Sequence, residues 1–287
     1  MSPDSALAGA VPRRVSDGSY ALGKSPAETR RLILQGKLNE AHTRNLLVMS
    51  GLTRGQRVLD IGCGAGDVTM LAADIVGPTG SVVGVDEDAD ILRVAKQRTE
   101  QAGLANVSFR QGTLPDVAVD EPVDALVGRL VLVHLPDPAA ALRALVERVR
   151  PGGLVSMIEF RTASTRAVPE VPLVTRCVEW CYAGFRAAGV DPDTGERLPR
   201  ILRDAGLRLQ GISVAGTAGH ADSAVVRYLA MTVESLLPVI EAHDIADRRE
   251  IGLATLEQRL RDEMRAENAV LYAPELICAW ANVDADH

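Results

Sequence analysis

The stretch Val58-Leu-Asp-Ile-Gly-Cys-Gly-Ala-Gly66 decides the fold of this chain. A short apolar run leads into an acid and three glycines at a spacing of two residues, and the helix-like pattern Val68–Ala72 follows at once. Glycine allows tight turns and lets a ligand approach the backbone closely. A strand, a tight turn and a helix N-terminus together predict a site for a nucleotide-like ligand.

The glycine spacing does not fit a dinucleotide. The pattern Gly-x-Gly-x-x-Gly/Ala would require a small residue where Asp67 stands, so an NAD-dependent oxidoreductase is disfavoured. Asp60 ends the first strand and would repel a pyrophosphate, whereas Asp86 ends the next apolar run, where an acid accepts hydrogen bonds from ribose hydroxyls. A positively charged nucleoside without phosphate fits both acids, and S-adenosylmethionine is such a molecule.

With these landmarks the chain resembles the class I S-adenosylmethionine-dependent methyltransferases of quinone biosynthesis and small-molecule natural-product pathways. The matching segments are Asp60–Gly66, Gly84–Asp86, Val123–Val127, Leu135–Pro138 and Arg150–Gly153. The resemblance implies an α/β fold, with a doubly wound, seven-stranded and mostly parallel sheet. N-terminal helices and a helical lid inserted near the C-terminus complete the expected architecture.

The expected domain organisation has two parts. Residues 1–50 are interpreted as a flexible leader and an N-terminal helical cover, and residues 51–287 as the methyltransferase domain. In the cover, Ser25 and Pro26 have the residue types of a helix start, and Gly51 is placed to end the second helix. We expect the last two strands to be antiparallel, with the lid, about 218–268, between them.

The resemblance assigns most cofactor contacts to the strand ends and leaves two on the helical cover. Thr113 stands where many relatives carry an aspartate for the adenine, and Tyr20 and Gln35 either contact the methionine portion or only pack the cover onto the core. The full expected set is Tyr20, Gln35, Asp60, Gly62, Cys63, Gly64, Gly66, Asp86, Glu87, Gly112, Thr113, Leu114, Arg129 and Leu130.

Composition narrows the class of acceptor. The chain has 287 residues, 47% hydrophobic and 24% charged, with a net charge of −7, and this acidic balance disfavours nucleic acid because phosphate neutralisation needs a basic face. No run of about 18 uncharged apolar residues suggests a membrane span. The four cysteines do not indicate a disulfide framework or, with the histidines, a metal site. We expect a cytoplasmic protein acting on a small molecule, and a homodimer is compatible with the sequence.

His134 and Glu159 are the titratable residues best placed to act as bases, because both follow strands of the expected sheet. The alternatives are a backbone cap for His134 and an ion pair with Arg129 or Arg161 for Glu159. Trp180, Tyr182 and Phe185 gather on one predicted helix of a chain that is only 3% aromatic, and they form either an acceptor pocket or part of the core.

We therefore expect methyl transfer from S-adenosylmethionine, with S-adenosylhomocysteine as product, to a small apolar or aromatic acceptor. Oxygen is slightly favoured over nitrogen or carbon because two bases are available. The alternative is a methyltransferase-like protein that binds S-adenosylmethionine but catalyses another reaction or serves as a non-catalytic subunit.

Overall fold

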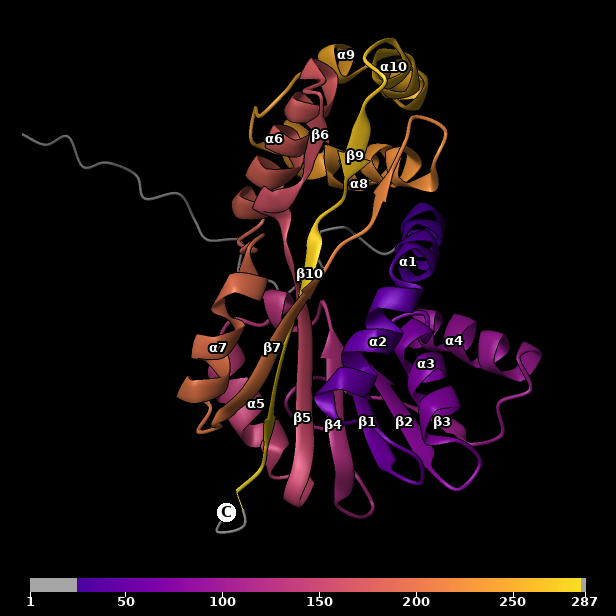
Figure 1. Ribbon diagram of the computed structural model, residues 1–287, viewed down its shortest axis with the longest axis vertical. Helices are drawn as coiled ribbons and strands as arrows, with labels where there is room; N and C mark the ends of the chain where they lie inside the picture. The colour runs from indigo at the N-terminus through magenta and orange to yellow at the C-terminus, as the bar shows by residue number, and fades with distance from the viewer. Residues whose placement is uncertain (1–24, 285–287) are drawn as a thin grey trace, which may run out of the picture.

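The computed structural model describes residues 25–284, and residues 1–24 and 285–287 lie outside that description. A large sheet occupies one half of the molecule and a smaller cap the other, as Figure 1 shows. The large sheet has the strand order β3-β2-β1-β4-β5-β10-β7. Its strands are β1 (Arg57–Ile61), β2 (Ser81–Asp86), β3 (Val107–Gln111), β4 (Val123–Arg129), β5 (Val149–Arg161), β7 (Leu209–Ala215) and β10 (Glu275–Asn282).

The first five strands of this sheet are parallel to their neighbours, whereas β10 is antiparallel to both β5 and β7. This arrangement confirms the seven-stranded, mostly parallel sheet and the antiparallel pairing of the last two strands. Because parallel strands end at one edge, the carboxyl ends of β1, β2, β4 and β5 all face the cap (Figure 1).

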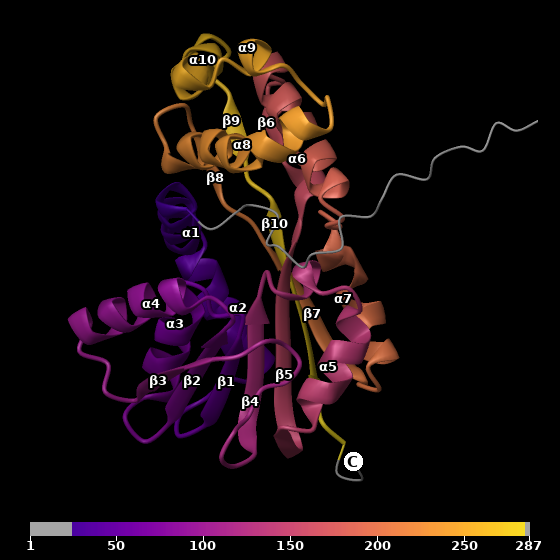
Figure 2. The same cartoon turned by 180° about the vertical axis from the view of Figure 1, so that it is seen from behind.

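Helices cover both faces of the large sheet, as its apolar strands require. On β4, Leu126 packs in the core that includes Leu142 and Leu202, while its neighbour Val127 packs in the core that includes Leu46 and Val68. The first face carries α5 (Pro138–Val146) and α7 (Thr194–Asp204), which Figure 2 shows on the near side. The second face carries α2 (Glu40–Ser50) and α3 (Asp67–Val76), and α4 (Ala89–Gln101) packs along β2 and β3.

The N-terminal helices begin and end where the sequence indicates. Ser25 accepts the backbone N–H of Glu28 and Pro26 opens α1 (Pro26–Leu38), which confirms the predicted helix start. Gly51 ends α2 with φ +110°, a left-handed conformation that glycine adopts without steric cost. α1 lies between the large sheet and the cap and contacts α8 (Ala224–Ala242) of the cap (Figure 1).

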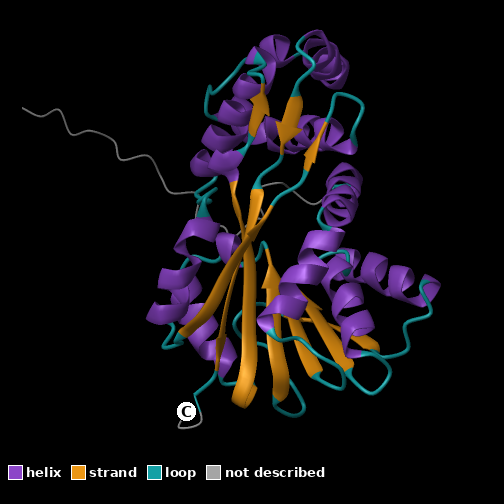
Figure 3. Cartoon of the chain, viewed as in Figure 1, coloured by secondary structure: helices purple, strands orange, loops and turns teal. Residues whose placement is uncertain are grey.

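The cap has its own three-stranded sheet and its own core, which Figure 3 shows as a group of strands apart from the large sheet. Its elements are β6 (Arg166–Val168), α6 (Pro172–Ala187), β8 (Ala218–Gly219), α8 (Ala224–Ala242), α9 (Arg248–Ile251), α10 (Leu253–Ala266) and β9 (Val270–Tyr272). The cap thus joins a segment after β5 to the segment between β7 and β10. In residues 25–284, no helix combines the length and apolar character that crossing a membrane requires.

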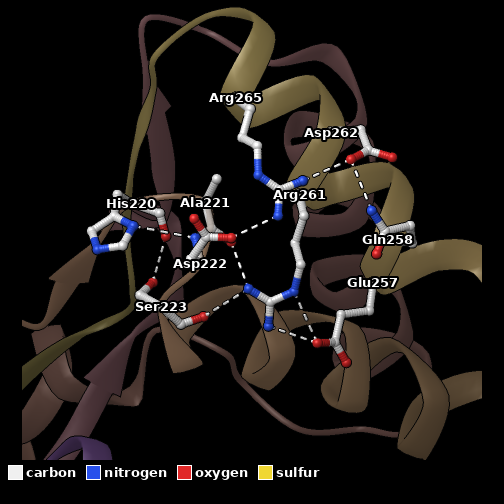
Figure 4. Close-up of polar contacts among 9 residues, drawn as sticks. All are labelled: His220, Ala221, Asp222, Ser223, Glu257, Gln258, Arg261, Asp262 and Arg265. Carbon is white, nitrogen blue, oxygen red and sulfur yellow. Dashed lines mark hydrogen bonds and ion pairs between the residues drawn. The ribbon is translucent and has the colours of Figure 1, made fainter.

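The two segments of the cap are held together by packing, and side-chain bonds fix the elements of the second segment to one another. α6 and α8 pack against each other in the cap core. Arg261 on α10 donates to the carbonyl oxygen of Ala221 at 2.6 Å and pairs with Glu257, as Figure 4 shows. This guanidinium fixes α10 to the turn that precedes α8.

Candidate active site

A cavity of about 1680 Å³ lies between the carboxyl edge of the large sheet and the cap. Its lower wall comes from the loops after β1, β2, β3, β4 and β5. Its upper wall comes from α6, α8 and the strand region around Leu271, while α1 closes one side. The cavity therefore lies where ligands bind in open parallel sheets, outside the carboxyl ends of the strands.

The glycine loop after β1 meets the cavity through Gly62, Cys63 and Gly64. At Gly62, φ is +60° and an added Cβ would lie 2.4 Å from Cγ2 of Val131, so no side chain fits there. At Gly64, φ is +52° and an added Cβ would meet no atom within 4 Å. Gly62 thus allows two loops to pack together, whereas Gly64 leaves open space for a ligand.

Asp86 lies on the cavity wall beside Gly64. Its Oδ2 accepts the backbone N–H of Gly64 at 2.9 Å and its Oδ1 accepts that of Asp88 at 3.0 Å. Burial raises the pKa of Asp86, and these two hydrogen bonds oppose the rise. Because each carboxylate oxygen can accept more than one hydrogen bond, Asp86 retains capacity for ligand hydroxyls.

Other residues after β2 and β3 also reach the cavity. Glu87 is exposed and lines its rim. Gly112, Thr113 and Leu114 line the wall next to it, and the N–H of Gly112 donates to the carbonyl oxygen of Asp86 at 3.0 Å. The structure therefore brings the residues expected around the nucleoside to one continuous wall.

Asp60 and Gly66, two of the expected cofactor contacts, do not line the cavity. Asp60 is 1% exposed, and its Oδ2 accepts the hydroxyl of Thr69 at 2.6 Å. Its Oδ1 has no partner within the described chain, and burial raises the pKa of Asp60 to about 7. An added Cβ at Gly66 would lie 3.1 Å from Cβ of Ala95, so this glycine serves the packing of α4. Asp60 thus lies behind the loop, and Gly66 lies where the loop joins α3.

Arg129 ends β4 and Leu130 follows it, and both residues line the cavity. Nη1 of Arg129 donates to Oγ1 of Thr43 at 2.8 Å, and no ion pair joins Arg129 to a described carboxylate. Most of its five N–H donors therefore remain available. Leu130 has φ +57°, which is unusual for a residue with a branched side chain.

His134 and Glu159, the expected bases, both line the cavity but in different states. Burial and the positive charge of Arg31 lower the pKa of His134 to about 4. Glu159 is 1% exposed, and burial raises its pKa to about 8. Its Oε1 accepts the backbone N–H groups of Val131 and Leu132, so the expected ion pair with Arg129 or Arg161 is not the contact that the structure shows.

Gln35 lines the cavity from α1, and Tyr20 lies outside the described residues. Oε1 of Gln35 accepts from Nη1 of Arg31 and from the hydroxyl of Tyr228, each at 2.8 Å. Arg31 also pairs with Glu28 at 2.7 Å. This buried network joins α1 to α8, so the packing role of Gln35 has direct support, and its contact with a cofactor stays a prediction.

Sequence reasoning did not single out Arg31 or Tyr228, although both line the cavity. The spacing of Glu28, Arg31 and Gln35 by three and four residues places them on one face of a helix. That spacing is the sequence feature from which the buried network of these three side chains could have been predicted. Tyr228 is far away in sequence and only the tertiary structure brings it there.

The three aromatics of α6 have separate surroundings. Trp180 belongs to the cap core, and the hydroxyl of Tyr182 donates to Oδ2 of Asp193 at 2.7 Å. Phe185 lines the cavity, as do Val178 and Cys181 on the same helix. Of the expected acceptor cluster, only Phe185 therefore reaches the site.

The chain is similar to known methyltransferases in sequence and in fold. A family model described as a methyltransferase domain matches residues 52–206, more than half of the chain. An arsenite methyltransferase of Aquipseudomonas alcaligenes is 39% identical over 207 residues, which are 68% of this chain and 60% of that protein.

A ubiquinone/menaquinone biosynthesis C-methyltransferase UbiE of Ectopseudomonas mendocina is 35% identical over 130 residues, which are 45% of this chain. The match spans 51% of that protein, so the chain covers only about half the length of such relatives. Among solved structures, a SAM-dependent methyltransferase from Aquifex aeolicus has a TM-score of 0.51 at 22% identity. That likeness covers 66% of this chain and 92% of the other and concerns the fold.

Proposed function

We propose that this chain, which belongs to the methyltransferase domain family, methylates a small, largely apolar organic acceptor. It has the fold of the class I S-adenosylmethionine-dependent methyltransferases. The observation that carries the proposal is the pairing of Asp86 with Gly64 on the cavity wall, an acid beside open space at the ends of two adjacent strands. Asp67 also lines this wall, but its carboxylate is paired with Arg98 at 2.8 Å, so Asp86 is the acid that favours a sulfonium nucleoside over a pyrophosphate.

In the proposed complex, Asp86 accepts hydrogen bonds from the ribose hydroxyls, and Gly112, Thr113 and Leu114 border the adenine. The available donors of Arg129 bind the carboxylate of the methionine portion, since a guanidinium matches a carboxylate in geometry and charge. These assignments use the residues that line the cavity and leave the upper wall for the acceptor.

The upper wall supports an apolar acceptor. Phe185, Val178, Leu229 and Val239 from α6 and α8 contribute apolar side chains to it, as in most pockets for small organic ligands. Arsenite, named for one relative, is a soft acceptor that thiolates bind. Only Cys63 and Cys181 of the four cysteines line the cavity, and burial raises the pKa of both thiols. An organic acceptor is therefore favoured.

The states of the two candidate bases bear on the methylated atom. His134, with a pKa of about 4, is a weak base, and Glu159 is occupied by backbone amides. The slight preference for oxygen rested on His134 and Glu159 being available as bases, so we propose an acceptor that ionises readily by itself, such as an acidic phenol or an enol. Methyl transfer then needs mainly an in-line approach: the nucleophile forms a bond to the methyl carbon, and the sulfonium keeps the electron pair of the broken S–C bond.

The test combines binding and transfer. The purified protein is titrated with S-adenosylhomocysteine and then incubated with methyl-labelled S-adenosylmethionine and a panel of phenols, enols and amines. We expect a 1:1 complex and label on a phenol or enol. Asp86→Ala should weaken binding by about 1–3 kcal/mol, the usual cost of losing hydrogen bonds to a charged acceptor. Unchanged affinity in the folded variant would contradict the placement, and binding without label transfer would favour the non-methylating alternative.

A further inference from the structure

Glu159 lies two residues before the end of β5, and its side chain is turned to the segment after β4. Its Oε1 accepts the N–H of Val131 at 3.0 Å and that of Leu132 at 2.7 Å. Its Oε2 is buried and has no partner within the described chain. A single carboxyl oxygen therefore fixes two consecutive amides of the segment 129–134, which would otherwise be unpaired donors in a buried place.

The segment that Glu159 fixes is conformationally costly. Leu130 has φ +57°, a conformation that costs a non-glycine residue free energy and persists only where the surroundings impose it. Val131 is enclosed by two glycines, because an added Cβ would lie 2.4 Å from its Cγ2 at Gly62 and 2.9 Å from its Cγ1 at Gly128. The glycines make room for Val131, and Glu159 supplies the attractive contacts that keep it there.

The segment presents functional side chains at both ends. Arg129 and Leu130 line the cavity at its start, and His134 lines it at its end. A change in the backbone at Val131 would move all three relative to the glycine loop. The position of the segment thus sets the shape of the wall between the proposed cofactor and acceptor regions.

We propose that Glu159 is a positioning residue, which holds the segment 129–134 in its left-handed turn and thereby places Arg129 and Leu130 for the cofactor. This inference rests on the proposed function for its effect on the ligand, but not for its effect on the backbone. It assigns to Glu159 a different role from the base expected from the sequence.

The surroundings of Glu159 also set its chemical form. Burial raises its pKa to about 8, so the neutral acid predominates at neutral pH. A neutral acid accepts the two amides through its carbonyl oxygen, and a glutamine side chain does the same with nearly the same shape. The Gln variant therefore separates the two roles, because it keeps the amide contacts but cannot take up a proton as a base.

The experiment compares Glu159→Gln, Glu159→Ala and Glu159→Asp with Asp60→Asn, a buried acid that contacts Thr69 instead of the segment. Hydrogen exchange of the Val131 and Leu132 amides is measured without ligand, followed by S-adenosylhomocysteine affinity and the pH profile of kcat. We expect exchange at both amides to rise at least about tenfold in the Ala and Asp variants, with affinity about tenfold weaker. The Gln variant should stay within about twofold of the wild type and keep its pH profile, and Asp60→Asn should leave both amides unchanged.

Opposite results would overturn the proposal. A Gln variant with wild-type amide exchange and affinity but kcat lowered about a hundredfold would identify Glu159 as a base. Unchanged amide exchange in the Ala or Asp variant would show that the segment 129–134 keeps its conformation without the Glu159 side chain. If Glu159→Ala fails to fold, amide exchange in the Glu159→Asp variant, whose side chain is shorter, tests the positioning role instead. A wild type that binds no S-adenosylhomocysteine refutes the proposed function, and the amide exchange still decides the role of Glu159.

Discussion

The large sheet and the cap form opposite walls of one cavity, and they do so by different means. On the sheet side, residues next to the ends of β1, β2, β3, β4 and β5 line the wall, so a few short stretches of sequence supply it. On the cap side, single apolar residues from α6, α8 and β9 face the cavity, and nothing in their type separates them from the core around them. The difference shows why the cofactor is easier to infer than the acceptor.

The largest expected effect concerns the loop packing on the sheet side. Gly62→Val should destabilise the protein by about 5 kcal/mol, since it adds strain at φ +60° and overlap with Val131. Gly64→Ala is the matched control, with a similar φ but no atom near the added carbon. It should cost about 1 kcal/mol in stability yet weaken S-adenosylhomocysteine binding. Chemical denaturation measures the stability of each variant and calorimetry its affinity for S-adenosylhomocysteine. Equal stability of Gly62→Val and Gly64→Ala would contradict the separate roles of the two glycines.

The second effect is a pH dependence that comes from Asp60. Its pKa is raised from 3.8 to about 7, so between these values the folded state binds a proton that the unfolded state has released. The stabilising contribution is full below pH 3.8 and is lost as the pH rises through about 7. Asp60→Asn should remove up to about 4 kcal/mol of this dependence. Denaturation across that window tests it, and a parallel pH dependence in the variant would place the titration at another group.

On the cap side, Phe185 should affect the acceptor alone. Phe185→Ala should raise the acceptor's KM about tenfold, the loss of roughly 1.4 kcal/mol of apolar contact, and leave S-adenosylhomocysteine affinity unchanged. Tyr182→Ala is the control, because its hydroxyl bonds to Asp193 and its side chain does not line the cavity. Steady-state kinetics decides the point, and a similar KM for both variants would remove Phe185 from the acceptor wall.

The smallest effect tests whether the cap is stabilised independently of the site. Arg261 has a side chain 16% exposed and bonds to the carbonyl oxygen of Ala221 (Figure 4). Arg261→Met should lower the free energy of unfolding by about 1–2 kcal/mol without changing cofactor affinity. Arg265→Ala, which removes two ion pairs of an arginine that is 46% exposed, should cost less than about 1 kcal/mol. Weakened cofactor binding in Arg261→Met would show that the cap also shapes the sheet side.

The sequence predicted the sheet and most of its wall because the relevant signals are local. Val58–Ile61 and Val82–Val85 are apolar runs that end in turns, and adjacent parallel strands must end at one edge. Asp86, Gly64 and Arg129 line the cavity for that reason. The helical periodicity of residues 218–268 predicts a helical segment there. The sequence did not show that β6 and α6 join it, because those contacts span distant parts of the chain.

By itself the sequence determined the alternation of apolar strands and helices, the helix ends at Ser25 and Gly51, and the presence of acids at two neighbouring strand ends. Only the tertiary structure decided that Asp86 lines the cavity while Asp60 is buried behind the loop, since Asp60 pairs in register with Gly84 and so lies two residues deeper in the sheet than Asp86. It alone decided that Glu159 binds the amides of Val131 and Leu132. Residue type gives the chemistry that a side chain is capable of, and packing gives the partners and the desolvation that select one role.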